Sequence, residues 1–99
     1  MAALVVATLR FKDIERYRRY MAAFPGVFAS SGGKVLVADE QPRQLSGNGA
    51  PIDKIVVMQF DDEAAVAPFF GSTEYREIAE DRDAGADVTS WLVKSYEDA

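Results

Sequence analysis

The chain has 99 residues, and 48% of them are apolar, which is the size and composition of a single small globular domain over residues 1–99. Its 11 basic and 16 acidic residues give a net charge of −5 with no dense basic cluster, so we expect no nucleic-acid partner. The absence of cysteine and histidine excludes a disulfide framework and a thiolate nucleophile, and it removes the commonest metal, haem and general-base side chain. We therefore expect no metal and no cofactor.

The first segment, residues 2–10 with the sequence AALVVATLR, is apolar and rich in β-branched residues, which predicts a buried strand. It lacks the charged region of a signal peptide and is too short to cross a bilayer. We therefore expect a cytoplasmic protein without a membrane partner.

A helix is predicted to follow, with Asp13 as its N-terminal cap. Its apolar residues recur at steps of three and four and so share one face: Ile14, Tyr17, Met21, Phe24 and Phe28. Pro25 lies within this run, and an interior proline removes a hydrogen bond and costs about 3 kcal/mol, so we expect a kink or a break near Phe24. The SSGG segment, residues 30–33, should end the helix with a glycine in a left-handed cap.

Two further strands are predicted around a polar hairpin region. The first is KVLVADE, residues 34–40, and the second is IDKIVVMQF, residues 52–60. Prolines and glycines between residues 41 and 51 interrupt strand pairing, although a short continuation of the strand at residues 43–46 is compatible with the pattern.

The next helical region begins with three acidic residues, Asp61, Asp62 and Glu63, which we interpret as helix capping rather than as a metal site. Pro68 and Gly71 predict a bend before the helix resumes at Thr73 and ends in the DAGA segment, residues 83–86. Residues 87–96 form the last predicted strand.

The resulting β-α-β-β-α-β order predicts an α+β, ferredoxin-like fold: a four-stranded antiparallel sheet with both helices on one face. Several strands carry apolar residues on both faces. On the first strand, Leu4 and Val6 alternate with apolar residues that point to the opposite face, and Trp91 and Val93 do the same on the last strand. The uncovered side would expose several hundred Å² of apolar surface. We expect a second copy of the sheet to cover it, as a face-to-face homodimer. The alternative is a monomer with a few exposed aliphatic residues.

Three stretches carry a resemblance to a known family: DIERYRRY running into GGKVLVA, LSG before a hydrophobic strand, and FDDEAAVAPFFGSTEYREIAEDRDAGA. In the last of these, Ser72, Tyr75 and Arg82 have the family's characteristic spacing. The chain resembles the domain of unknown function 1330 family, a branch of the dimeric α/β-barrel superfamily, although Ser46 stands where an acidic residue is usual. The resemblance implies a sheet-to-sheet dimer and a cavity between helices and sheet. In the wider superfamily, cofactor-independent monooxygenases, isomerases and haem enzymes hold their ligands in such a cavity.

The residues of the second helix also suggest a site. Ser72, Tyr75 and Arg82 share the apolar face, and a buried guanidinium must meet a carboxylate, helix-end carbonyl groups or a bound anion. In a structural interpretation Arg82 caps carbonyl groups or pairs with Asp13, Asp83 or Asp87.

In a functional interpretation Arg82 binds a ligand carboxylate or enolate while Tyr75 and Ser72 donate hydrogen bonds, and Phe69 and Met58 form an apolar wall. Tyr17 either faces the same cavity or is a core residue with its hydroxyl group at the surface.

These patterns predict a small homodimer that binds a small organic, anionic ligand between helices and sheet. One alternative is a cofactor-independent enzyme, similar to a monooxygenase or an isomerase, that uses Arg82 and Tyr75. A second alternative is a non-catalytic structural interaction module, which a filled cavity would favour. The sequence identifies no catalytic residue.

Overall fold

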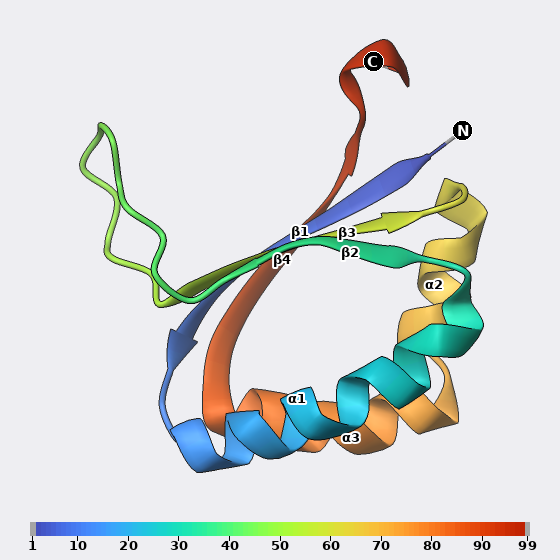
Figure 1. Cartoon of the computed structure of the whole chain (residues 1–99), viewed down its shortest axis with the longest axis horizontal. Helices are drawn as coiled ribbons and strands as arrows, with labels where there is room; N and C mark the ends of the chain where they lie inside the picture. The colour runs from blue at the N-terminus through green and yellow to red at the C-terminus, as the bar shows by residue number, and fades with distance from the viewer. Residues whose placement is uncertain (1, 99) are drawn as a thin grey trace.

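The computed structural model describes residues 2–98, so the first and last residues of the predicted domain lie outside it (Figure 1). Four strands and three α-helices follow one another in the predicted order. Their bounds are β1 Ala3–Phe11, α1 Ile14–Phe28, β2 Lys34–Asp39, β3 Lys54–Phe60, α2 Val66–Phe70, α3 Thr73–Gly85 and β4 Ala86–Lys94.

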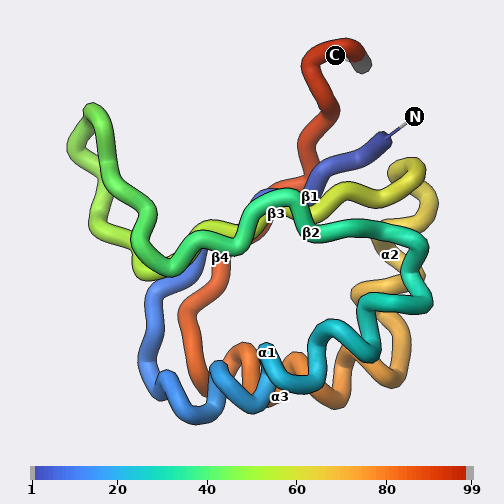
Figure 2. Tube along the Cα trace, in the orientation of Figure 1, coloured from blue at the N-terminus to red at the C-terminus, as the bar shows by residue number. Residues whose placement is uncertain are grey.

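The four strands form one antiparallel sheet in the order β2-β3-β1-β4. Figures 1 and 2 show this sheet as one layer, with α1 and α3 side by side as the second layer on one of its faces. The loop between β2 and β3 and the C-terminal segment extend away from the helices (Figure 1). The predicted two-layer arrangement is thus confirmed.

The core lies between the layers, and alternation along the strands places it there. On β1, alternate residues from Ala3 to Leu9 are buried toward the helices, as are Met58 and Phe60 of β3. The helices contribute mainly aromatic side chains to this core. They are Tyr17, Tyr20, Phe24 and Phe28 from α1, Phe69 from α2 and Tyr75 from α3.

Of the two outcomes expected at Pro25, a kink or a break, the structure contradicts the break. The helix continues through Pro25 to Phe28, and the rings of Phe24 and Phe28 stack with their centroids 4.9 Å apart across that point. Ile14 is exposed instead of packed in the core, and Tyr20 is buried. At 100° per residue, Ile14 lies roughly 75° around the helix from the centre of the buried face, which explains its exposure.

The strand ends also differ. The third strand starts at Lys54 rather than at residue 52, the last strand spans Ala86–Lys94, and residues 43–46 form no strand. Pro42 and Pro51 lack the N–H group that a strand ladder needs, which leaves residues 40–53 as a long loop. The predicted glycine cap after α1 is confirmed at Gly32, where φ is 76°.

The sheet face opposite the helices is apolar across its full width. The strand register aligns Val37, Val57, Val6 and Trp91 in one row across all four strands. At the two ends of that row Val37 is 40% exposed and Trp91 is 49% exposed. We call this row, with Leu4 and Val93 beside it, the outer face. Within residues 2–98, no helix has the length and apolar character needed to span a membrane.

Candidate functional site

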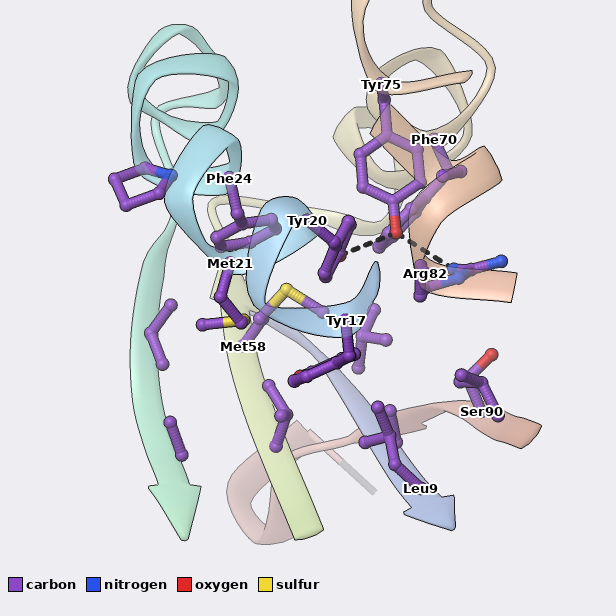
Figure 3. A pocket seen from close by; sticks show the side chains of 18 of the residues that line it. Leu9, Tyr17, Tyr20, Met21, Phe24, Met58, Phe70, Tyr75, Arg82 and Ser90 are labelled. Atoms are coloured by element: carbon purple, nitrogen blue, oxygen red, sulfur yellow. Dashed lines mark hydrogen bonds between the residues drawn. The ribbon is translucent and has the colours of Figure 1, made fainter. Parts of the chain in front are cut away.

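A cavity of about 590 Å³ lies between the helices and the inner face of the sheet. Its floor consists of aliphatic and thioether side chains of the strands, and its opposite wall of aromatic side chains of the helices (Figure 3). The floor includes Val5, Ala7, Leu9, Val56, Met58 and Val88, and the wall includes Tyr17, Tyr20, Phe24, Phe70 and Tyr75. The cavity therefore presents a mainly apolar surface to anything that it holds.

The polar end of the cavity is a short chain of hydrogen bonds between α1 and α3. Arg82 Nη1 donates to the Tyr75 hydroxyl oxygen over 2.9 Å, and the hydroxyl groups of Tyr75 and Tyr20 are also 2.9 Å apart (Figure 3). Burial, and then the neighbouring Tyr75, raise the pKa of Tyr20 well above its usual value, so Tyr20 is a neutral phenol at neutral pH. All three side chains line the cavity.

Arg82 has one carboxylate partner among the described residues. Its Nε and Nη2 both lie 2.9 Å from Asp83 Oδ1, and the Asp83 side chain is 64% exposed whereas that of Arg82 is 26% exposed. Although burial opposes the charge, Tyr75 and Asp83 raise the pKa of Arg82 above its ordinary value. The other two predicted partners are engaged elsewhere, since Asp13 caps α1 and Asp87 pairs with Lys12.

Tyr17 is held by its ring rather than by its hydroxyl group. Its ring centroid lies 5.0 Å from that of Phe11 and 4.9 Å from Lys54 Nζ. The residue is 1% exposed and lines the cavity, and its hydroxyl group makes no hydrogen bond to any residue between 2 and 98. Tyr17 therefore offers an unused hydrogen-bonding group.

A cluster of charged side chains lies next to the Tyr17 ring. Lys54 is 2% exposed, and its Nζ lies 3.3 Å from Glu40 Oε2 and 3.6 Å from Met21 Sδ. Arg18 donates from both terminal nitrogens to the two oxygens of Glu40. These hydrogen bonds, first from Arg18 and then from Lys54, lower the pKa of Glu40 from 4.5 to about 2 despite the opposing effect of burial.

The structure brings four of the six predicted site residues together around the cavity: Arg82, Tyr75, Tyr17 and Met58. Ser72 and Phe69 lie outside it. The Ser72 hydroxyl oxygen caps α3 by accepting from the Tyr75 backbone N–H over 3.2 Å, and it donates to the Phe69 carbonyl over 2.7 Å. Phe69 packs in the core against Phe28 and Phe60.

Sequence reasoning missed Tyr20 and Phe70. Tyr20 lies three residues after Tyr17 and four before Phe24, so its helical spacing was the available signal. Phe70 follows Phe69 directly, and the structure places Phe70 rather than Phe69 at the cavity.

Of the acidic residues that follow β3, Asp62 caps the next helical turn, Glu63–Ala65, as predicted. Asp62 Oδ1 accepts from the Ala65 backbone N–H over 3.0 Å. Among residues 2–98, no group of three or more metal-ligating side chains converges on a common point.

Two solved structures of unknown function share this fold. A protein from Rhodopseudomonas palustris is 21% identical with a TM-score of 0.82, over 95% of this chain and 82% of that chain. A dimeric ferredoxin-like protein from Jannaschia sp. CCS1 is 11% identical with a TM-score of 0.79, over 96% of this chain and 100% of that chain.

SnoaB, a cofactor-independent oxygenase from Streptomyces nogalater, is 12% identical with a TM-score of 0.71, over 95% of this chain and 92% of that chain. No match was found among curated proteins. At these identities the structural likeness establishes the ferredoxin-like fold. A sequence model of the domain of unknown function 1330 family matches residues 2–96. The chain therefore belongs to the domain of unknown function 1330 family.

Proposed function

We propose that the protein binds a small organic ligand, with an apolar body and an anionic oxygen group, in the cavity between helices and sheet. The observation that carries this proposal is the placement of Arg82, a partly buried cation that lines a cavity of about 590 Å³ beside two phenols. A cavity of this volume is within the range of small-molecule sites.

The guanidinium of Arg82 has donors to spare for such a ligand. A guanidinium carries five N–H groups, and the contacts with Tyr75 and Asp83 use three of them. Because Asp83 is mostly exposed, water already screens its attraction for Arg82. A ligand carboxylate that enters the cavity can therefore bind Arg82 without displacing a buried ion pair.

The rest of the cavity suits the body of the ligand. Its aliphatic floor and its aromatic wall, which includes Phe24 and Phe70, favour a flat, ring-containing molecule. An open cavity with these walls also argues against the purely structural alternative, which a filled interior would favour.

A catalytic function is the second candidate, and it is supported by the fold shared with SnoaB and by Arg82 and Tyr75 as donors to an oxyanion. Proton abstraction would need a base in the cavity. No carboxylate is among the described side chains that line it, and Tyr20 has a raised pKa. Binding is therefore the better supported function.

We further propose that two copies of the chain pack through their outer faces. The apolar row from Val37 to Trp91 supports this, as do the dimeric structures that share the fold. Light scattering at micromolar concentration should give about twice the chain mass of 10.9 kDa, and a mass near 10.9 kDa would contradict the proposal.

The ligand proposal is tested with 2-naphthoate as an anionic probe and 2-naphthalenemethanol as its neutral counterpart. Calorimetric titration should show tighter binding of the naphthoate. The Arg82→Met variant should lose roughly tenfold or more of that affinity, since hydrogen bonds to a charged group are lost. Arg19→Met serves as the matched control because Arg19 is exposed and does not line the cavity.

Equal affinity for 2-naphthoate in the wild-type protein and in Arg82→Met would contradict the ligand proposal. Native mass spectrometry of the freshly purified protein complements this titration, because a co-purified anion that is absent from Arg82→Met would identify the natural ligand. A catalytic role predicts instead that Arg82→Met loses turnover of a bound substrate while its affinity persists.

A further inference from the structure

The hydroxyl group of Tyr17 is a second polar point in the cavity, separate from Arg82. Tyr17 is 1% exposed, and no residue between 2 and 98 pairs with its hydroxyl group. Among the described residues no side-chain oxygen or nitrogen is both fully buried and unpaired, so this hydroxyl group keeps a small accessible surface, and the space that Tyr17 lines is the cavity. Its hydrogen-bonding capacity is therefore open to a group from outside the chain that enters the cavity.

The position of Tyr17 keeps this point apart from the Arg82 end. The ring centroid of Tyr20 lies 5.7 Å from that of Tyr17 and 6.2 Å from that of Tyr75. Tyr20 therefore stands between the other two phenols, as Figure 3 shows. No hydrogen bond joins Tyr17 to the chain formed by Arg82, Tyr75 and Tyr20, so we treat its hydroxyl group as a second binding point that calls for a second group on the ligand.

The number of unpaired phenol protons in the cavity indicates which kind of group the ligand must supply. The Tyr75 oxygen accepts from Arg82, and the hydrogen bond between Tyr75 and Tyr20 contains one phenol proton. Whichever phenol donates, the proton of the other one has no acceptor among the described residues, and Tyr17 adds a further unpaired proton.

The lining side chains also include no carboxylate to accept these protons. The cavity thus has hydrogen-bond donors in excess, and its ligand must supply acceptors.

We infer that the cavity binds a ring-containing ligand with two separate oxygen groups: an anionic oxygen at Arg82 and Tyr75, and a carbonyl or hydroxyl oxygen that accepts from Tyr17. This inference rests on the proposed function, and it narrows the ligand class from a ring-containing anion to a ring-containing anion with a second oxygen substituent.

The test compares 2-naphthoate with its 5-, 6- and 7-hydroxy derivatives on the wild-type protein and on Tyr17→Phe, by calorimetric titration. Tyr17→Phe removes only the hydroxyl group and keeps the ring contacts with Phe11, Tyr20 and Lys54. We expect at least one hydroxy derivative to bind the wild-type protein about fivefold to tenfold more tightly than 2-naphthoate does. In Tyr17→Phe that gain should be abolished, so that the hydroxy derivative binds the variant no more tightly than 2-naphthoate does.

Three other results would overturn the inference. In the first, no derivative gains affinity over 2-naphthoate. In the second, the gain survives in Tyr17→Phe, so that another group binds the second oxygen. In both of these cases, the proposed function still stands if the binding of 2-naphthoate depends on Arg82. In the third, no naphthoate binds the wild-type protein, and both proposals fail together. Thermal unfolding of Tyr17→Phe, which should be no less stable than the wild-type protein without ligand, checks that the variant folds.

Discussion

Lys54 shows how a buried charge is held beside the cavity. Its ammonium group has three kinds of neighbour: the Glu40 carboxylate, the Met21 sulfur and the Tyr17 ring. Burial of an ammonium group costs several kcal/mol unless a partner charge compensates for it. Glu40 is that partner, and Arg18 holds Glu40 in place through two parallel hydrogen bonds.

We predict that Glu40→Gln lowers the free energy of unfolding by about 2 kcal/mol at pH 7, between the values typical of surface and buried pairs. The loss arises because Lys54 keeps its charge without a counter-charge. Lys54→Met should have a small effect, since methionine fills the same space beside Met21. In the double variant, Lys54→Met should recover most of the loss. Urea unfolding at one fixed protein concentration measures all four proteins, and additive effects of the two substitutions would contradict the pairing.

The same carboxylate gives an acid dependence of stability. The pKa of Glu40 is about 2 in the folded protein against 4.5 as its ordinary value, so the folded state binds its proton later than the unfolded state does. The stabilisation by Glu40 is fully present above about pH 4.5 and is lost as the pH falls toward 2. From pH 5 to pH 3, wild-type stability should therefore fall more steeply than that of Glu40→Gln. Parallel pH profiles would show that Glu40 is not responsible.

The sequence predicts individual side chains well where helical spacing decides their direction. Tyr75 and Arg82 are seven residues apart on one helix, so their common direction follows from the helical period. The bond between Tyr20 and Tyr75 joins residues 55 positions apart, and no local pattern predicts it. Ser72 was ambiguous for another reason, because a serine before a helix suits both a cap and a pocket, and here it is a cap.

The contact between α1 and α3 depends on a small residue. Gly85, the last residue of α3, packs where α1 begins, and its carbonyl oxygen accepts from the backbone N–H groups of Lys12 and Asp13. A Cβ atom at Gly85 would lie 2.8 Å from Tyr17 Cα and 2.9 Å from the Asp13 carbonyl oxygen. Both are backbone atoms, so the helices would have to separate.

We predict that Gly85→Ala destabilises the protein by about 2 kcal/mol or more, because the added methyl group overlaps the backbone of α1. Gly26→Ala is the matched control. Gly26 lies inside α1 with no atom within 4 Å of the added Cβ, so this change should stabilise the protein by about 0.5–1 kcal/mol. Thermal unfolding of both variants at one protein concentration shows whether each substitution stabilises or destabilises the protein. A stabilising Gly85→Ala would contradict the close packing of α1 on α3.

The elements themselves were largely predictable, because the change from alternating to helical apolar patterns occurs at each boundary. The failures share a physical cause. A break at Pro25, one of the two outcomes expected there, assumes that local backbone cost dominates, whereas the aromatic residues Phe24 and Phe28 on either side are both buried in the core. The absence of the strand continuation considered at residues 43–46 also depends on tertiary context. The apolar residue in that segment, Leu45, has no surface to pack on and is exposed.

The two proposed surfaces lie on opposite faces of one sheet. On β1, Val5 and Ala7 line the cavity while Leu4 and Val6 belong to the outer face. A change on the outer face therefore reaches the cavity only through the backbone of the sheet. This arrangement separates self-association from ligand binding and makes each testable without loss of the other.

We predict that Trp91→Glu converts the dimer to a folded monomer. Trp91 is 49% exposed in the single chain and is not part of the core between sheet and helices, so its replacement leaves that core intact. In a face-to-face dimer, however, the introduced carboxylate of each copy would be buried without a partner, a cost of several kcal/mol.

Ile14→Glu is the matched control, since Ile14 is an exposed apolar residue at the start of α1, away from the outer face. Light scattering should give about 10.9 kDa for Trp91→Glu and twice that mass for Ile14→Glu, with unchanged circular dichroism in both. Binding of 2-naphthoate should persist in the Trp91→Glu monomer, because the cavity is built within one chain. A Trp91→Glu variant that stays dimeric would place the interface elsewhere, and a monomer without affinity would show that the cavity needs its partner.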